Sequence, residues 1–128
     1  MVSPLPPKFI DSMMSGMAAK YELKKTKSGF HFNLKAPNGK YILTSEVYVE
    51  KRSALKHIES VQKNSGGERQ YEVRKSKREE PYFVLIAKNG EIIGKSEMYK
   101  TMKGCRNGIA SCIKFGPGAR LEDLAIQG

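Results

Sequence analysis

A duplication of about fifty residues is the feature that most constrains how this chain can fold. Tyr21-Glu-Leu-Lys-Lys-Thr-Lys27 recurs as Tyr71-Glu-Val-Arg-Lys-Ser-Lys77, and Ser45-Glu-Val-Tyr48 recurs as Ser96-Glu-Met-Tyr99. Aligning 21–28 with 71–78 and 32–64 with 83–115 gives 16 identities in 41 pairs, 4 of 8 and 12 of 33. Similarity at a fixed period indicates one supersecondary unit used twice, with both copies sharing a core.

Hydrophobic periodicity predicts the same elements in each copy. In the first copy, apolar residues alternate through three segments and then recur at helical spacing at Ala54, Ile58 and Val61. Asn38-Gly39 predicts a tight two-residue hairpin turn, and Thr101 is a candidate N-cap for the second helix. The fold class is therefore α+β, with two tandem β-β-β-α repeats and an antiparallel sheet on which the helices pack. The expected strands are 21–27, 30–36 and 41–46, then 71–77, 81–87 and 91–97, and the expected helices are 52–64 and 102–114.

This pattern also predicts the domain organisation. Residues 1–19 form an N-terminal extension with a short amphipathic helix, because Phe9, Met13 and Met17 recur at i, i+4 and i+8. The first repeat spans 20–66 and the second 67–124, and together 20–124 make one structural domain.

The middle strand of the second repeat is apolar on both faces. Tyr82, Val84 and Ile86 occupy the positions that carry polar residues in the first repeat, and such a strand needs cover on both sides. Two occupants fit this requirement. One is the chain's own extension with Phe9, Met13 and Met17, and the other is a second chain in a two-fold dimer.

The net charge of +10 is spread over both repeats rather than gathered in a tail. An excess of this size favours a nucleic acid or an acidic protein surface as partner, or it serves solubility alone. The residues expected to bind an anionic partner lie on or beside the predicted strands of both repeats: Lys24, Lys25, Lys27, Lys35, Arg74, Lys75, Lys77 and Arg78.

No residue pattern for catalysis, a cofactor or a metal is evident in the sequence. It lacks phosphate-binding and dinucleotide-binding glycine motifs, and His31 and His57 have no carboxylate and nucleophile at a recognisable spacing. Cys105 and Cys112 lie about 10.5 Å apart along a helix, at roughly 1.5 Å per residue, too far for a disulfide. They are expected to be buried and apolar. We expect no catalytic residues, no cofactor and no metal.

A second repeated pair is polar. Ser45-Glu46 and Ser96-Glu97 recur in both copies, which indicates either a turn or cap or a repeated ligand contact. Glu79-Glu80 lies where the chain turns before Pro81.

The sequence also bears on location. No apolar run approaches the roughly 20 residues of a membrane span, and Met1 to Lys8 lacks the pattern of a secretory signal. We therefore expect a cytoplasmic protein with no membrane contact.

Several of these motifs together resemble the YegP-like family of small bacterial and archaeal proteins. They are the Tyr-Glu start, Ala-x-Asn-Gly, Ser-Glu-x-Tyr, Asn107-Gly108-Ile109 and the closing Ala119-Arg-Leu-Glu-Asp123. The resemblance covers about 20–123. It implies a duplicated unit of three strands and a helix, uncharacterised function, no transferable catalytic residues and the occurrence of dimers. Residues 1–16 and the high charge depart from that pattern.

These observations lead to a hypothesis of function. The chain is expected to be a non-enzymatic interaction module, homodimeric, that binds an acidic or polyanionic macromolecule through a basic face. The alternative is a non-specific or structure-selective nucleic-acid-binding protein. An enzyme with an unfamiliar site is the third hypothesis.

Overall fold

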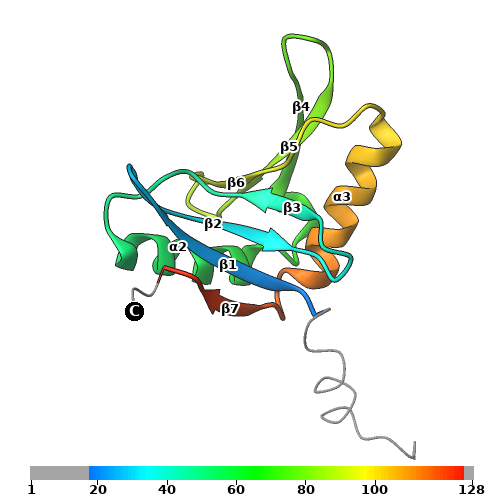
Figure 1. Cartoon of the computed structure of the whole chain (residues 1–128). Coiled ribbons are helices and arrows are strands. Elements are labelled where there is room, and N and C mark those ends of the chain that lie inside the picture. Colours follow the sequence, from blue (N-terminus) through cyan, green and yellow to red (C-terminus); the bar gives the residue numbers. More distant parts are fainter. Residues whose placement is uncertain (1–17, 126–128) are drawn as a thin grey trace, which may run out of the picture.

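The computed structural model describes residues 18–125 (Figure 1). The predicted extension with Phe9, Met13 and Met17 therefore lies outside the described residues. The elements occur within a few residues of their expected positions. In order they are β1 (Lys20–Thr26), β2 (Gly29–Lys35), β3 (Tyr41–Thr44), α2 (Lys51–Asn64), the short 3-10 helix η2 (Glu68–Gln70), β4 (Tyr71–Lys75), β5 (Pro81–Ile86), β6 (Ile92–Lys95), α3 (Met102–Phe115) and β7 (Arg120–Asp123).

The strands form one sheet whose order reflects the duplication. The order β4-β5-β6-β3-β2-β1-β7 reads symmetrically about the β3–β6 pair, apart from β7. Registers match as well, because Tyr21 pairs with Leu34 as Tyr71 pairs with Leu85, and both repeats carry an irregularity one residue later. The two repeats are thus related by an approximate two-fold axis between β3 and β6.

The core lies between one face of this sheet and the two helices. Alternation in the strands directs side chains such as Phe32, Leu34, Phe83 and Leu85 towards the helices. Helix α2 packs on β2, β5 and β6, and helix α3 packs on β3 and β5. Within the described residues, the opposite face of the sheet has no helix over it, and we call it the open face (Figure 1).

The antiparallel sheet that we expected is mixed, because β7 pairs in parallel with β1. Leu124 N donates to Leu23 O at 2.8 Å, and Lys20 pairs with Glu122 at 3.1 Å. Lys51 at the start of α2 pairs with Asp123 at 2.6 Å. These contacts join residues about 70 to 100 positions apart, so local periodicity could not show them.

Two equivalent tyrosines tie the repeats together. Tyr21 in β1 donates to Gly116 O after α3, and Tyr71 in β4 donates to Ser65 O after α2, both at 2.6 Å. The last carbonyl groups of a helix lack intrahelical partners. Each repeat therefore supplies the hydrogen bond that caps the helix of the other, which explains why the tyrosine occurs in both copies.

The hairpin turn differs from the prediction. Ala36 N donates to Lys40 O at 2.8 Å, so the loop has three residues rather than two. Gly39 has a φ of +89°, whereas Asn38 stays at negative φ and accepts from Lys40 N at 3.0 Å. The pattern is a turn followed by a left-handed glycine, and the same geometry recurs at Gly90.

Other local predictions are confirmed. Thr101 accepts a hydrogen bond from Gly104 N at 3.0 Å and so caps α3. Exposed Glu79 lies in the β4–β5 turn with a φ of +65°.

Candidate functional site

The basic residues expected to form one binding face are spread apart. Strands β1 and β4 are separated by four strands and run in opposite directions, because each neighbouring pair between them is antiparallel. The lysines after β1 and those after β4 therefore lie at opposite ends of the sheet. Four of the eight predicted side chains also have carboxylate partners: Lys24 and Lys35 with Glu22, Arg74 with Glu72, and Lys75 with Glu79.

The partner of two of these lysines, Glu22, is a buried carboxylate that sequence reasoning missed. Its side chain accepts from Tyr41 Oη at 2.7 Å and lies 3.6 Å from Lys24 Nζ and 3.4 Å from Lys35 Nζ. Burial alone would raise the pKa of Glu22, but the Tyr41 hydrogen bond and the two ammonium groups outweigh it and hold that pKa below its ordinary value. Lys24 and Lys35 are thereby engaged within the protein and are less available to a partner.

The remaining four predicted residues are Lys25, Lys27, Lys77 and Arg78. All four are exposed, and none has a carboxylate partner among residues 18–125. They lie in or beside the β1–β2 and β4–β5 turns, which point away from each other.

The apolar strand of the second repeat lies on the open face. No described element covers Tyr82, Val84 or Ile86, yet Val84 is only 2% exposed. Its cross-strand neighbours are Glu72 and Lys95, and Lys95 Nζ lies 5.1 Å from the centre of the Tyr82 ring. Neighbouring side chains thus provide much of the cover that we had assigned to another element. A homodimer contact through this strand stays a prediction.

The repeated serines have a structural role. Ser45 Oγ accepts from Phe32 N and donates to Glu46 O, and Ser96 Oγ makes the same two bonds to Phe83 N and Glu97 O. The acceptor distances are 2.9 Å in both copies. The serines therefore hold the strand ends together rather than forming a turn or cap, while the glutamates are exposed.

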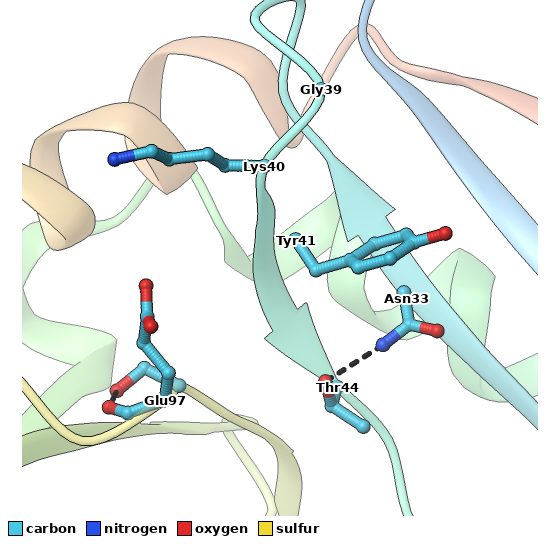
Figure 2. A pocket seen from close by; sticks show the side chains of 7 residues that line it. Asn33, Gly39, Lys40, Tyr41, Thr44 and Glu97 are labelled. Atoms are coloured by element: carbon cyan, nitrogen blue, oxygen red, sulfur yellow. Dashed lines mark hydrogen bonds between the residues drawn. The ribbon is translucent and has the colours of Figure 1, made fainter.

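A surface depression of about 490 Å³ lies at the seam between the repeats (Figure 2). Its floor holds the Asn33 amide, which donates to Thr44 Oγ1 at 2.7 Å. Lys40 and Glu97 line it from different repeats, together with Gly39, Tyr41 and Ser96. The depression is open and offers polar groups without a nucleophile paired to a base. Between residues 18 and 125, no three His, Cys, Asp or Glu side chains gather closely enough to hold a metal.

The two histidines lie in different settings. His57 in α2 stacks on Tyr48 with ring centres 4.5 Å apart, and its Nε2 lies 3.2 Å from Glu91 Oε2 in the β5–β6 turn. This contact joins the repeats across 34 positions, so no local motif could show it. Burial, with a smaller contribution from Lys24, lowers the pKa of His31 on the open face.

Both cysteines are buried and free, as expected. Burial raises the pKa of Cys112 to about 12 and also raises that of Cys105. Neither thiol is suited to nucleophilic chemistry at neutral pH, because the thiolate is the reactive form.

A basic surface that the sequence analysis missed lies on α3. No acidic residue occurs between Glu97 and Glu122, a segment that contains five basic residues. Lys103, Arg106 and Lys114 are exposed on the solvent side of α3, with exposed Lys100 just before the helix. Within the described residues, none of the four has a carboxylate partner. We call Lys100, Lys103, Arg106 and Lys114 the α3 basic face.

Comparison with known proteins shows which family has this architecture. The model of a domain of unknown function, DUF1508, matches residues 26–72 and again 76–123. The chain belongs to the DUF1508 family. The two matches confirm the duplication, and each runs from the end of one strand through a hairpin and a helix to the strand that follows.

Relatives in this family confirm the YegP-like resemblance. The UPF0339 protein YegP of Yersinia pestis is 51% identical over 107 residues, covering 83% of this chain and 96% of the relative. A UPF0339 protein of Pseudomonas aeruginosa is 47% identical over 108 residues, covering 84% and 98%.

Solved structures show the same fold. The solution structure of yegP from E. coli, a protein of unknown function, has a TM-score of 0.80 at 42% identity and covers 88% of this chain and 97% of that one. A UPF0339 protein from Shewanella oneidensis has a TM-score of 0.79 at 44% identity, with coverage of 85% and 93%. None of the helices in residues 18–125 combines the length and apolar character needed to cross a membrane.

Proposed function

We propose that this protein is a non-enzymatic binding module that takes an acidic protein partner on the α3 basic face. The observation that carries the proposal is the acid-free segment 98–121, whose exposed lysines and arginines lack carboxylate partners among the described residues. Unpaired cations on a rigid helix attract an anionic surface without first breaking an internal ion pair.

The surroundings of this face favour a protein over a nucleic acid. Met98 and Met102 near the start of α3 are 37% and 36% exposed, and Ala110 is exposed between the cations. Methionines are adaptable contacts for protein surfaces. Exposed aromatic rings that stack on bases would favour a nucleic acid, but the solvent side of α3 carries Lys103, Arg106, Asn107, Ala110 and Lys114.

The test compares two charge-reversal pairs of equal size. Lys103→Glu with Arg106→Glu changes the α3 basic face, and Lys77→Glu with Arg78→Glu changes the β4–β5 turn by the same total charge. Binding to fluorescein-labelled polyglutamate, duplex DNA and single-stranded RNA is followed by anisotropy at about 50 mM and 300 mM salt.

We expect the α3 pair to weaken polyglutamate binding about 30-fold. This corresponds to about 0.5 kcal/mol for each of four unit changes in exposed charge. The turn pair should change it by less than about threefold. Equal losses for both pairs would show that net charge alone is responsible and would overturn the proposal. Tighter binding of DNA or RNA than of polyglutamate would establish the nucleic-acid alternative instead.

Homodimerisation is a separate proposal, supported by the partly exposed Tyr82 and Ile86 on the open face. Light scattering on a size-exclusion column tests it. A dimer that Tyr82→Ser with Ile86→Ser converts to a monomer would support it, and a monomer at high concentration would refute it.

A further inference from the structure

The two edges of the sheet are unequal, although strands β1 to β6 are arranged symmetrically. Strand β7 lies against the outer edge of β1. The position related to β7 by the approximate two-fold axis lies against the outer edge of β4, and no strand within residues 18–125 occupies it. We call this unoccupied position the β4 edge.

The backbone groups that point outward from β4 can be identified by comparison with β1. Leu23 O accepts from Leu124 N, so the peptide groups of Leu23 face away from β2. Val73 is the equivalent of Leu23, because Leu23 pairs with Phe32 as Val73 pairs with Phe83. Val73 therefore directs its own N–H and C=O outward, since both groups of one strand residue point to the same side. Its side chain is 39% exposed.

The two-fold relation gives each edge of the sheet a neighbouring helix. Helix α2 contacts β7 through the Lys51–Asp123 ion pair and the bond from Gln62 Nε2 to Ala119 O at 3.1 Å. The positions 51 residues later are Met102 and Ile113 in α3, and Arg106 corresponds to Leu55 between them. The two-fold relation therefore places Met102, which is 36% exposed, and Arg106 of the α3 basic face beside the β4 edge.

We propose that the acidic partner binds as an extended peptide segment that adds as an eighth strand, parallel to β4, between Val73 and Arg106. This inference rests on the proposed function and names the mode of binding. Strand addition supplies affinity through main-chain hydrogen bonds, and neighbouring side chains supply selectivity. The cations of α3 select an acidic segment.

A second copy of this protein fits the edge less well. In β7, Glu122 and Asp123 are held by Lys20 and Lys51. The corresponding positions beside β4 are Gln70 and Met102, which carry no charge, so β7 of another molecule would lose both ion pairs there.

The test uses a defined probe, an acetylated and amidated octapeptide of alternating valine and glutamate. Its control is the same peptide with every backbone amide N-methylated, which keeps the charge and removes the N–H groups from both edges of the strand. Hydrogen exchange of the full-length protein is followed by NMR with and without each peptide. The Leu23 amide, already paired with β7, is the internal reference.

Two substitutions distinguish the contribution of the Val73 backbone to peptide binding from that of its side chain. Val73→Pro removes the outward N–H, a change tolerated on edge strands because the bonds to β5 are kept. Val73→Thr alters the side chain and keeps that N–H. We expect the peptide to slow exchange of the Val73 amide, Val73→Pro to weaken binding at least about tenfold, and Val73→Thr to weaken it less than about threefold. Lys103→Glu with Arg106→Glu, which leaves β4 intact, should weaken binding as well.

The outcomes separate this inference from the proposed function. Equal binding of the N-methylated peptide, or an unchanged Val73 amide, would overturn strand addition while the α3 basic face could still bind polyglutamate. Insensitivity to the α3 reversal would overturn both. If the Val73 amide exchanges slowly in the protein without peptide, the β4 edge is already occupied and the proposal of an external acidic peptide is overturned. The occupant would then be a second copy if the protein is a dimer, and another segment of the same chain if it is a monomer.

Discussion

Replacing Gly108 by alanine should destabilise the protein, although alanine is the better helix former. A Cβ atom at this position would overlap the Tyr99 hydroxyl and lie 2.8 Å from Tyr99 Cζ and 3.0 Å from Phe83 Cε2. Phe83 is fully buried, and Tyr99 stacks on it with ring centres 6.3 Å apart, so neither ring can retreat freely. Close approach of another element is thus the reason for this glycine.

The expected magnitude follows from two opposing effects. Alanine gains about 1 kcal/mol of helix propensity over glycine, and overpacking of this kind costs about 1–3 kcal/mol. Because the overlap is with Tyr99, whose ring stacks on the fully buried Phe83, we expect a net loss of about 1–2 kcal/mol. At about 4–8 °C per kcal/mol for a domain near this size, the midpoint of thermal unfolding should fall by about 5–15 °C.

Gly104 in the same helix is the matched control. A Cβ there would lie 3.3 Å from Thr101 Oγ1 and 3.5 Å from Tyr99 Cδ1, so Gly104→Ala should retain part of the propensity gain and leave the stability equal or raised by up to about 0.5 kcal/mol. Urea unfolding followed by circular dichroism measures both variants. The reasoning is refuted if Gly108→Ala is as stable as Gly104→Ala. Tyr99→Phe, which removes the hydroxyl, should recover part of the loss in a Gly108→Ala background.

Three further predictions concern buried groups. Tyr21→Phe should cost about 2 kcal/mol and Tyr71→Phe about 1 kcal/mol in urea unfolding, because each leaves a helix-end carbonyl without its donor and the Tyr21 site is the more buried; equal, negligible losses would show that the tyrosines are not caps. The Glu22 carboxylate has a lowered pKa, so its stabilisation is present above the ordinary value of 4.5 and is lost as the pH falls through the lowered one. Glu22→Gln should therefore lower stability at neutral pH and flatten the acid limb of a stability–pH profile, and an unchanged limb would contradict this. Cys105 and Cys112 should resist a disulfide reagent at pH 8 in the native protein and react after denaturation, whereas rapid reaction in the native state would refute their burial.

The sequence was most informative where structure depends on neighbouring residues. Period-two and helical patterns located most of the strands and both helices, and the duplication required the two halves to fold alike. The buried Cys105 and Cys112 followed from their alignment with Ala54 and Val61, which are also buried. Thr101 was identified as a cap because capping depends on a side chain and an N–H three residues away.

The contacts that were missed join distant segments or depend on the side of the sheet that a residue occupies. Strand β7 has four residues and too short a pattern to identify, and its parallel partner lies about 100 positions earlier. The sequence did not show that the basic residues are spread apart, because the distance between β1 and β4 depends on the order of the strands in the sheet rather than in the chain. The α3 basic face could have been found, since the absence of acidic residues from 98 to 121 is visible in the sequence.

The position of β7 has a consequence for synthesis of the chain. A ribosome makes residues in order, so Lys20–Thr26 is complete long before Arg120–Asp123 exists. Until then, β1 can pair with β2 on one side, while its other side presents free peptide groups to any passing strand. The nascent protein thus has two unpaired sheet edges, at β1 and at β4, and the finished chain has one. Conditions that slow the completion of translation should expose this vulnerability as aggregation of incomplete chains, before any effect on the mature fold is visible.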